Sequence, residues 1–319
     1  MNLPPHPRYI REQERLTKYY AIVIQQIVSI IKDIEGETLT KRQQQAVLTQ
    51  ISSMTMELEK KQKEWCEDVI TSVFTDAQAR ALISLGVVET IAEARKKVTT
   101  NTFQQQRVQA MIDDTFEDLL QATRHMDRRT KRLVRDIVAE TQRVNALQRK
   151  GYDSTRHEIF NELRRQGFSK SIRDQAFVGI VDRSGRRWDL RTYSNMIAKT
   201  KIQQAQVEGA RVEALEYDTD LAIISHSGAV DACRHFEGMI ISLEGRTRGY
   251  RTYRELRDSN LIFHPNCQHT VHPIILDNLP PNLREIAEKA RVSGERAFEN
   301  PKAAISEGLK RERELKKKK

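Results

Sequence analysis

The segment His264-Pro265-Asn266-Cys267-Gln268-His269-Thr270-Val271-His272-Pro273 contains the first proline after Pro7, and it follows a chain whose first 150 residues are compatible with long helices. Residues 226–272, which include Cys233-Arg234-His235 and all of this segment except Pro273, hold five of the eight histidines and two of the three cysteines. Cysteine and histidine are preferred zinc ligands. Their concentration in a chain otherwise poor in both marks this stretch as the place where chemistry is to be sought.

The residues before this segment predict long helices. Gly36 and Gly86 are the only glycines among the first 150 residues, and both are expected to break the helical pattern. Apolar side chains recur there at three- and four-residue steps, which is typical of amphipathic helices. We therefore expect one helix up to Gly36, a second over residues 38–73, and an unbroken helical span over residues 89–150. So long a span indicates a helical hairpin or a rod supported by partner chains.

After Gly151 the period of the pattern changes and predicts a small domain that mixes helices and strands. The expected elements are a short helix over 154–165, a β-hairpin formed by 177–181 and 187–191, a helix over 194–215, and strands at 220–225, 239–241 and 261–263. The predicted fold class is α+β, with a long, mainly helical N-terminal region followed by a small α+β C-terminal domain with short strands. The predicted domains are 1–150, an extended helical region; 151–275, the α+β domain with the Cys/His cluster; and 276–319, a charged, helical, basic tail.

The chain is basic, and two of its basic segments could contact phosphate. It has 54 Lys and Arg residues against 44 Asp and Glu residues, a formal net charge of +10. The four final residues, Lys316, Lys317, Lys318 and Lys319, are candidate nucleic-acid contacts, and a solvated, frayed terminus is the alternative. The basic residues within Arg124–Arg135 could be a nucleic-acid stripe, but the absence of interleaved aromatic side chains favours a solvated helix face.

Membrane insertion and secretion are not indicated by the sequence. The longest apolar stretch, residues 21–31, contains Gln25, Gln26 and Ser29 and falls short of the roughly 20 apolar residues that a bilayer-spanning helix needs. The first residues lack the pattern of a secretory signal. We expect residence inside a cell, where cysteines stay reduced. Cys66, beside Trp65 in a helical pattern, is then best interpreted as a buried packing residue.

Three interpretations of the Cys/His cluster stay open from the residues alone. Zinc could be held by the pairs Cys233/His235 and Cys267/His269, although one intervening residue is tighter spacing than usual, with His264 and His272 as further candidates. The cysteines could instead pack in a core while the histidines cap turns, giving a helical scaffold without metal. A Cys233–Cys267 disulfide is the third interpretation, and it requires an oxidising medium.

An enzymatic interpretation has weaker support. His235-Phe236-Glu237 has the H-x-E form, and Pro265-Asn266-Cys267 follows about thirty residues later, as in zinc deaminases. The second thiolate that those enzymes need is missing, and no paired catalytic histidine and asparagine of an HNH-type nuclease are evident. The alternative function is therefore a metal-dependent hydrolase, nuclease-like or deaminase-like, that acts on nucleic acid with Glu237 as general base.

The stretch from Phe177 to Pro273 resembles the phage minor capsid protein 2 family, which is related to the Mu F-like head morphogenesis proteins. The closing His264-Pro265-Asn266-Cys267 followed by His269 is the most specific part of this resemblance. The other matching residues are Gly179-Ile180-Val181-Asp182, Gly185-Arg186-Arg187-Trp188, Tyr193-Ser194-Asn195-Met196, Lys199-Thr200, Glu208-Gly209, Ile224-Ser225-His226, Cys233 and Gly238. The segment 234–237 departs from the family pattern, which makes His235 a poor candidate as a family-wide ligand.

The resemblance implies a non-enzymatic structural protein of a tailed-phage head, present in few copies. Its expected partners are the portal protein, capsid proteins and packaged double-stranded DNA, with homo-oligomerisation and without a membrane. The expected location is the capsid interior of the virion, and the host cytoplasm during assembly. Within this interpretation the small domain is clamped around Cys233, His264, Cys267 and His269, the candidate ligands of a structural zinc ion. The residues after 276 are too few for an attached toxin domain.

Overall fold

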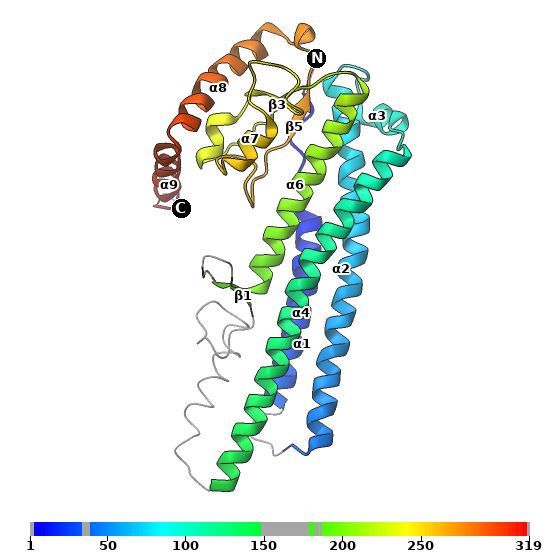
Figure 1. Ribbon diagram of the computed structural model, residues 1–319, viewed down its shortest axis with the longest axis vertical. Coiled ribbons are helices and arrows are strands. Elements are labelled where there is room, and N and C mark those ends of the chain that lie inside the picture. The colour runs from blue at the N-terminus through cyan, green and yellow to red at the C-terminus, as the bar shows by residue number, and fades with distance from the viewer. Residues whose placement is uncertain (1–2, 34–38, 148–178, 182–184, 186, 318–319) are drawn as a thin grey trace. The chain divides into compact units, whose positions relative to one another are not determined.

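The computed structural model of the chain describes residues 3–33, 39–147, 179–181, 185 and 187–317 (Figure 1). The predicted α+β class is confirmed, because long helices come first and short antiparallel strands follow. In chain order, the elements are α1 (Ile10–Asp33), α2 (Lys41–Ser84), α3 (Ile91–Lys97), α4 (Thr102–Leu147), β1 (Ile180–Val181), β2 (Arg187–Trp188), α6 (Leu190–Glu216), β3 (Leu221–Ile224), η2 (Ala232–Phe236), β4 (Ile240–Ser242), α7 (Tyr253–Asp258), β5 (Val271–Pro273), η3 (Leu276–Asn278), α8 (Pro281–Glu299) and α9 (Pro301–Lys317).

The chain divides into two compact units, each assembled from segments that are far apart in the sequence. The sheet unit consists of Met1–Tyr9, Asp68–Ile112 and Lys199–Lys319. The bundle unit consists of Ile10–Glu67 and Asp113–Ala198. The predicted domains 1–150, 151–275 and 276–319 are a different, contiguous division of the chain, which stays a prediction.

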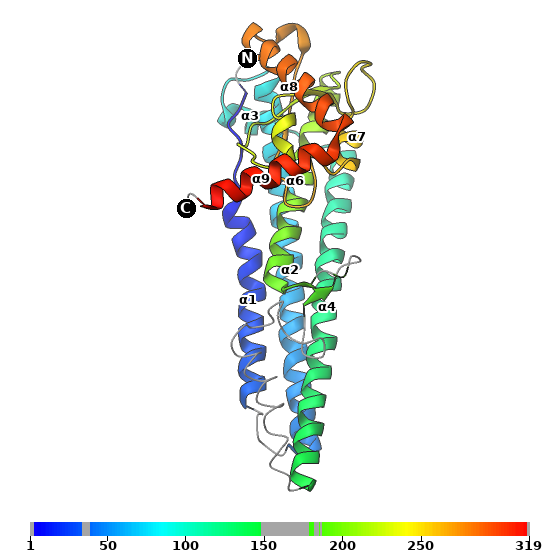
Figure 2. The same cartoon turned by 90° about the vertical axis from the view of Figure 1, so that its left-hand side faces the viewer.

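The bundle unit is held together by the apolar faces of its helices, which run side by side in Figures 1 and 2. Tyr20 of α1 is fully buried, and its hydroxyl lies 3.3 Å from the carbonyl oxygen of Leu119 in α4. Trp65 of α2 is also buried, and its indole Nε1 donates to the carbonyl oxygen of Glu12 at 2.8 Å. Each ring thus packs in the core and keeps a partner for its polar atom. Cys66 is buried beside Trp65, as predicted.

Two helix boundaries differ from those expected. The second helix continues to Ser84 instead of ending near Val73, and Gly86, with a φ of 75°, ends it. The unbroken helix expected over residues 89–150 is wrong, because α3 ends at Lys97 and α4 starts at Thr102. Asn101 restarts the helix: its Oδ1 accepts from the backbone N–H of Gln104 at 2.9 Å, and Gln104 Oε1 accepts from Asn101 N at 3.2 Å. This reciprocal cap satisfies backbone donors that would otherwise lack partners.

The sheet unit is built on three antiparallel strands in the order β4-β3-β5, of which β3 and β5 are labelled in Figure 1. In the central strand β3, Ala222 pairs with Ile241 of β4 and with Pro273 of β5. Ala222 and Ile224 face one hydrophobic cluster, while Leu221 and Ile223 face another. Successive side chains of a strand point to opposite faces, so a strand covered on both faces is apolar throughout.

One strand prediction in this unit is wrong, and one strand was not predicted. Leu261-Ile262-Phe263 forms a buried bend, with Asn260 and Phe263 in the left-handed region at a φ of 57° each. A short apolar run does not distinguish a strand from any other buried segment. The third strand is instead β5, which carries His272. The strands expected at 220–225 and 239–241 are confirmed as β3 and β4.

The predicted hairpin and the helix after it are also present. β1 pairs antiparallel with β2, with Ile180 opposite Trp188. The second strand is shorter than expected, because Leu190 already begins α6, and α6 extends to Glu216. Residues 177, 178 and 182–184 of the predicted hairpin, and the helix predicted over 154–165, lie outside the described residues.

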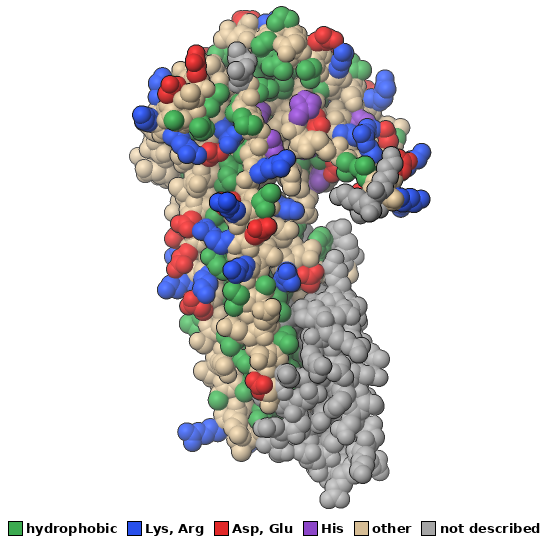
Figure 3. Space-filling view, turned by 180° about the vertical axis from the view of Figure 1, so that it is seen from behind, with side chains coloured by type: hydrophobic (Ala, Val, Ile, Leu, Met, Phe, Trp, Pro, Cys, Tyr) green, Lys and Arg blue, Asp and Glu red, His purple; other side chains and the backbone are tan. Residues whose placement is uncertain are grey.

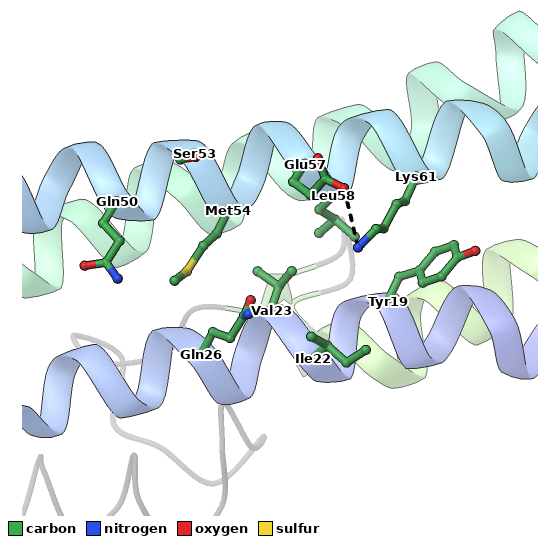
Figure 4. A pocket seen from close by; sticks show the side chains of 10 residues that line it. All are labelled: Tyr19, Ile22, Val23, Gln26, Gln50, Ser53, Met54, Glu57, Leu58 and Lys61. Carbon is green, nitrogen blue, oxygen red and sulfur yellow. Dashed lines mark ion pairs between the residues drawn. The ribbon is translucent and has the colours of Figure 1, made fainter.

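The bundle unit carries a groove of about 290 Å³ between α1 and α2 (Figure 4). Apolar side chains such as Val23 and Leu58 lie beside polar ones, and Lys61 forms an ion pair with Glu57 at 3.5 Å. The full lining is Tyr19, Ile22, Val23, Gln26, Gln50, Ser53, Met54, Glu57, Leu58 and Lys61. Its lining contains no cysteine or histidine, so it lacks the residue types of the cluster predicted from the sequence.

Candidate metal centre

Two segments of the sheet unit supply the four predicted ligands. Cys233 lies on η2, which begins after Asp231 because the Asp231 carboxylate accepts from the backbone N–H of Cys233 at 3.1 Å. His264, Cys267 and His269 lie in the connection from α7 to β5. A turn brings this connection back, with Cys267 N donating to His264 O at 2.9 Å and Asn266 in the left-handed region at a φ of 71°. Both segments are therefore positioned by backbone hydrogen bonds.

The four side chains lie in a row of close contacts. The Sγ atoms of Cys233 and Cys267 are 3.8 Å apart. His264 Nε2 lies 3.1 Å from Cys233 Sγ, and His269 Nδ1 lies 3.2 Å from Cys267 Sγ. The ligand atoms form two groups that share Cys233: Cys233 with Cys267 and His269, and Cys233 with His264 and Asp231, each within 4.8 Å. The structure thus brings together all four residues predicted from the sequence.

The second ring nitrogen of each histidine is held by a hydrogen-bond partner. His264 Nδ1 lies 2.9 Å from the carbonyl oxygen of Pro265. His269 Nε2 lies 3.0 Å from Glu237 Oε1 and 3.0 Å from Ser227 Oγ. Histidines that bind metals usually donate their other N–H to a carboxylate or a backbone carbonyl, which fixes the ring orientation. Both histidines show this arrangement.

Glu237 is itself held firmly. Its Oε1 accepts from the backbone N–H of Ser227 at 2.8 Å and from that of Ala229 at 3.0 Å. Burial opposes ionisation of the carboxyl, yet hydrogen bonds from His269, Ala229 and Ser227 lower its pKa to about 2. Glu237 therefore stays ionised at any ordinary pH and orients His269.

The charges of the cluster favour a thiolate at Cys267. Hydrogen bonds from Cys233 and His269 lower the pKa of the Cys267 thiol, and the same contact between the two thiols, together with burial, raises the pKa of Cys233. Burial would lower the pKa of His269, but its hydrogen bonds with Cys267 and Glu237 raise it to about 9. A hydrogen bond with Asp231 raises the pKa of His264. Since metals bind thiolates and neutral imidazoles, binding here must displace protons.

Three of the four candidate ligands fit a tetrahedral zinc ion most closely, because the ligand atoms of Cys233, Cys267 and His269 all lie within 4.8 Å of one another, whereas His264 forms a separate group with Cys233 and Asp231. Two sulfur ligands at about 2.3 Å from zinc are about 3.8 Å apart at tetrahedral angles, which is the separation of Cys233 and Cys267. The sulfur–nitrogen contacts of 3.1 and 3.2 Å are a few tenths shorter than the roughly 3.5 Å of such a site. Cys233, Cys267 and His269 are buried, so an ion at this point would be shielded from water.

The two other interpretations of the cluster can be compared with the same distances. The cysteines are free, and 3.8 Å is far longer than the roughly 2.05 Å of a disulfide bond. Both cysteines belong to one hydrophobic cluster of the sheet unit together with Phe236 and Phe263, so they also pack as core residues. Packing alone does not require two imidazoles directed at the two sulfur atoms, whereas a metal site does.

The other histidines of residues 226–272 are used elsewhere. His235 Nδ1 lies 3.0 Å from Ser293 Oγ of α8, so the pair Cys233/His235 is not formed. His272 lies on β5, and burial lowers its pKa to about 4. His226 is exposed, 3.7 Å from Glu237. Figure 3 shows histidine side chains reaching one face of the sheet unit.

Two residues near the sulfur atoms did not stand out as metal-site residues in the sequence. Asp231 caps the start of η2 by accepting from the backbone N–H of Cys233. Its Oδ2 also lies 3.4 Å from His264 Nε2. Glu237 drew notice only as a candidate general base. An Asp two positions before Cys233 is a recognisable cap signal, but nothing in the sequence pairs Asp231 with His264 or Glu237 with His269.

The C-terminal helices pack on the segment that carries Cys233. Gly308 of α9 lies against Asp231, where an added Cβ would come within 2.9 Å of Asp231 Cα. Gly294 of α8 lies against Phe236, where an added Cβ would come within 3.1 Å of the ring. Arg234 also forms an ion pair with Glu307 of α9. Both glycines thus let the helices approach η2 closely.

The basic tail is described only in part. Lys317 is exposed at the end of α9, and Lys316 belongs to the same helix. Lys318 and Lys319 lie outside the described residues, as does the side chain of Lys316. The candidate nucleic-acid contact at residues 316–319 therefore stays a prediction. None of the helices among the described residues has the length and apolarity needed to cross a membrane.

Comparison with known proteins identifies the class of this chain. The model of the family described as Phage minor capsid protein 2 matches residues 22–319, nearly the whole sequence. The chain belongs to this family, and is therefore a structural component of a phage virion. No curated protein and no solved structure matches it.

Proposed function

We propose that this chain is a minor head protein of a tailed phage that acts in the capsid interior beside the portal, after assembling in the host cytoplasm. The observation that carries the proposal is the family match over residues 22–319. Long helices such as α2 and α4, of 44 and 46 residues, offer extended surfaces to portal and capsid proteins or to further copies of this chain.

The location can be tested on purified virions. Mass spectrometry of intact heads should detect the chain in few copies, and cross-linking should join it to the portal protein. Protease added to intact heads should leave it whole, whereas the same protease should digest it once the heads are opened. Absence from heads would refute the role, and digestion in intact heads would refute the interior location.

We further propose that Cys233, His264, Cys267 and His269 hold a structural zinc ion. Support comes from the 3.8 Å separation of the two sulfur atoms and from the hydrogen bonds that orient both imidazoles. The ion would join η2 to the connection between α7 and β5, two segments that no disulfide links. Zinc bound at four protein ligands contributes directly to folding free energy, which a small core needs.

A third part of the proposal concerns the basic tail. Lys316, Lys317, Lys318 and Lys319 would contact packaged double-stranded DNA through phosphates, without reading bases. A chain truncated before Lys310 should retain DNA less well than the full chain, and the difference should shrink as salt rises. If the full and the truncated chain retained DNA equally well at every salt concentration, the tail would not be a DNA contact.

The alternative function, a metal-dependent hydrolase of nucleic acid, requires Glu237 to accept a proton. That carboxylate already accepts hydrogen bonds from Ser227, Ala229 and His269, and its pKa of about 2 makes it a weak base. We therefore expect no cleavage or deamination of single- or double-stranded DNA with zinc, magnesium or manganese. Activity that disappears in Glu237→Gln would overturn this expectation.

A further inference from the structure

Four arginines form a line along α4 within the bundle unit. They are Arg124, Arg128, Arg132 and Arg135, and all four are exposed. Their steps of four, four and three residues match the helical repeat of about 3.6, so they lie on one face of the helix. In Figure 2, α4 runs along one side of the helices of this unit. We call these four residues the arginine ridge.

The structure separates the ridge from the other basic residues of the same segment. Lys131 is engaged, because its Nζ donates to Asp127 Oδ2 at 2.7 Å, and Asp127 also accepts from Thr55 at 3.2 Å. Arg129, too, has an interaction partner. Within the described part of the chain, by contrast, no ridge arginine forms an ion pair or a side-chain hydrogen bond. The (i, i+4) spacing of Asp127 and Lys131 already indicates their ion pair in the sequence, whereas the lack of such partners at the ridge arginines is known only from the described structure.

The composition of the ridge face indicates the kind of partner. The other exposed positions between residues 121 and 139 are Gln121, Asp136 and Ala139, so the face has no large apolar or aromatic side chain, and one carboxylate stands against four guanidinium groups. Protein interfaces bury an apolar core, and single-stranded nucleic acid is bound through stacking on aromatic rings. A row of guanidinium groups that has neither an apolar core nor aromatic rings is instead suited to binding the phosphate groups of a DNA duplex.

We propose that the arginine ridge binds the phosphate backbone of double-stranded DNA without sequence preference. The ridge covers 11 residue steps, about 16 Å of helix, which corresponds to about five base pairs along a DNA axis. The inference rests on the proposed function only in taking packaged DNA as the polyanion. It assigns the contact to residues of the bundle unit, whereas the tail residues 316–319 belong to the sheet unit.

The test uses the full chain and a fluorescent random-sequence DNA duplex, with binding measured by anisotropy between about 50 and 200 mM salt. The four substitutions Arg124→Gln, Arg128→Gln, Arg132→Gln and Arg135→Gln are combined in one variant. Four phosphate contacts correspond to a salt slope of about 3.6, or about a hundredfold change in affinity over this range. The ridge variant should lose that share of the slope and keep its helical circular dichroism.

A matched control removes the same charge elsewhere, by combining Lys41→Gln, Arg42→Gln, Lys60→Gln and Lys96→Gln at exposed positions. This control should keep most of the wild-type slope. If the ridge variant kept the wild-type salt dependence of DNA affinity, the proposal would be overturned. The ridge would then be assigned to binding an acidic protein surface. Equal losses in both variants would also overturn it, since net charge alone would then explain binding. A chain truncated before Lys310 and detection in virions remain separate measurements, so failure of the ridge is distinguishable from failure of the proposed function.

Discussion

The Sγ atoms of Cys233 and Cys267 lie 3.8 Å apart, although 34 positions separate the two residues in the chain. One sulfur comes from a 3-10 helix after β3 and the other from the connection before β5. Their separation equals the edge of a zinc tetrahedron with two sulfur ligands, and each sulfur has an imidazole nitrogen within 3.2 Å. The short distance between the two Sγ atoms therefore identifies which of the clustered cysteines and histidines form the candidate metal site.

Elemental analysis should find one zinc ion per chain in protein purified without chelators. Cys267→Ser should lose the ion, because serine is a poor zinc ligand and the remaining three residues cannot close a tetrahedral site. Chelation should lower the melting temperature of the unaltered chain. Cys66→Ala is the matched control, since Cys66 is a buried residue of the bundle unit and does not belong to the cluster. Zinc content that Cys267→Ser leaves unchanged would refute the assignment.

Glu237→Gln should weaken zinc binding by about 10- to 100-fold without abolishing it. The carboxylate orients His269 from 3.0 Å and increases the basicity of its ring, and loss of such a partner has effects of this size. Competition with a chromophoric chelator would measure the affinity. Glu285→Gln, at an exposed position of α8, should bind zinc like the unaltered chain. If both variants bound zinc equally well, the orienting role of Glu237 would be wrong.

Gly209→Ala should destabilise the chain by about 1–3 kcal/mol, although alanine favours helices over glycine by about 1 kcal/mol. Gly209 lies on α6 against α2, where an added Cβ would overlap the carbonyl oxygen of Phe74 and come within 2.9 Å of Ala77 Cβ. Urea denaturation would measure the change. Ser306→Ala, at an exposed helical position, is the control and should be nearly neutral. A Gly209→Ala variant as stable as the unaltered chain would show that the two helices can separate at little cost.

Glu213 should make the chain less stable as the pH rises from about 4.5 to about 7. Burial raises the pKa of this carboxyl to about 7, since one hydrogen bond from Gln78 at 3.2 Å does not offset the loss of solvent. Over this window the unfolded chain releases the proton while the folded chain retains it. The stability gained from the raised pKa is thus complete below about pH 4.5 and is lost as the pH passes the folded value.

Glu213→Gln should therefore flatten the pH dependence and stabilise the chain at about pH 8 by up to a few kcal/mol. Gln78 is fully buried, and its Oε1 has no hydrogen-bond partner among the described residues, so an amide at 213 can supply a donor. Denaturation at about pH 4.5 and about pH 8 would measure the effect, with Glu89→Gln at an exposed position as the control. The same stability difference at both pH values would exclude Glu213 as the source.

Local signals in the sequence were enough for the helices and for the ligand types. The absence of proline between Pro7 and Pro265 and the regular apolar spacing predicted α1, α2 and α6. The break before α4 was missed because Asn101 and Gln104 were not recognised as a reciprocal cap. Leu261-Ile262-Phe263 was mistaken for a strand because apolar runs are common to all buried segments.

The sequence by itself determined the residue types of the candidate site and the α+β class, because composition, periodicity and turn residues act over a few positions. Only the tertiary structure decided that Cys233 faces Cys267, that Glu237 holds His269, and that the arginine ridge is exposed without an ion-pair partner among the described residues. These relationships join residues through chain reversals or depend on which helix face is covered. Distances of this kind are set by packing of the whole unit, which no local pattern encodes.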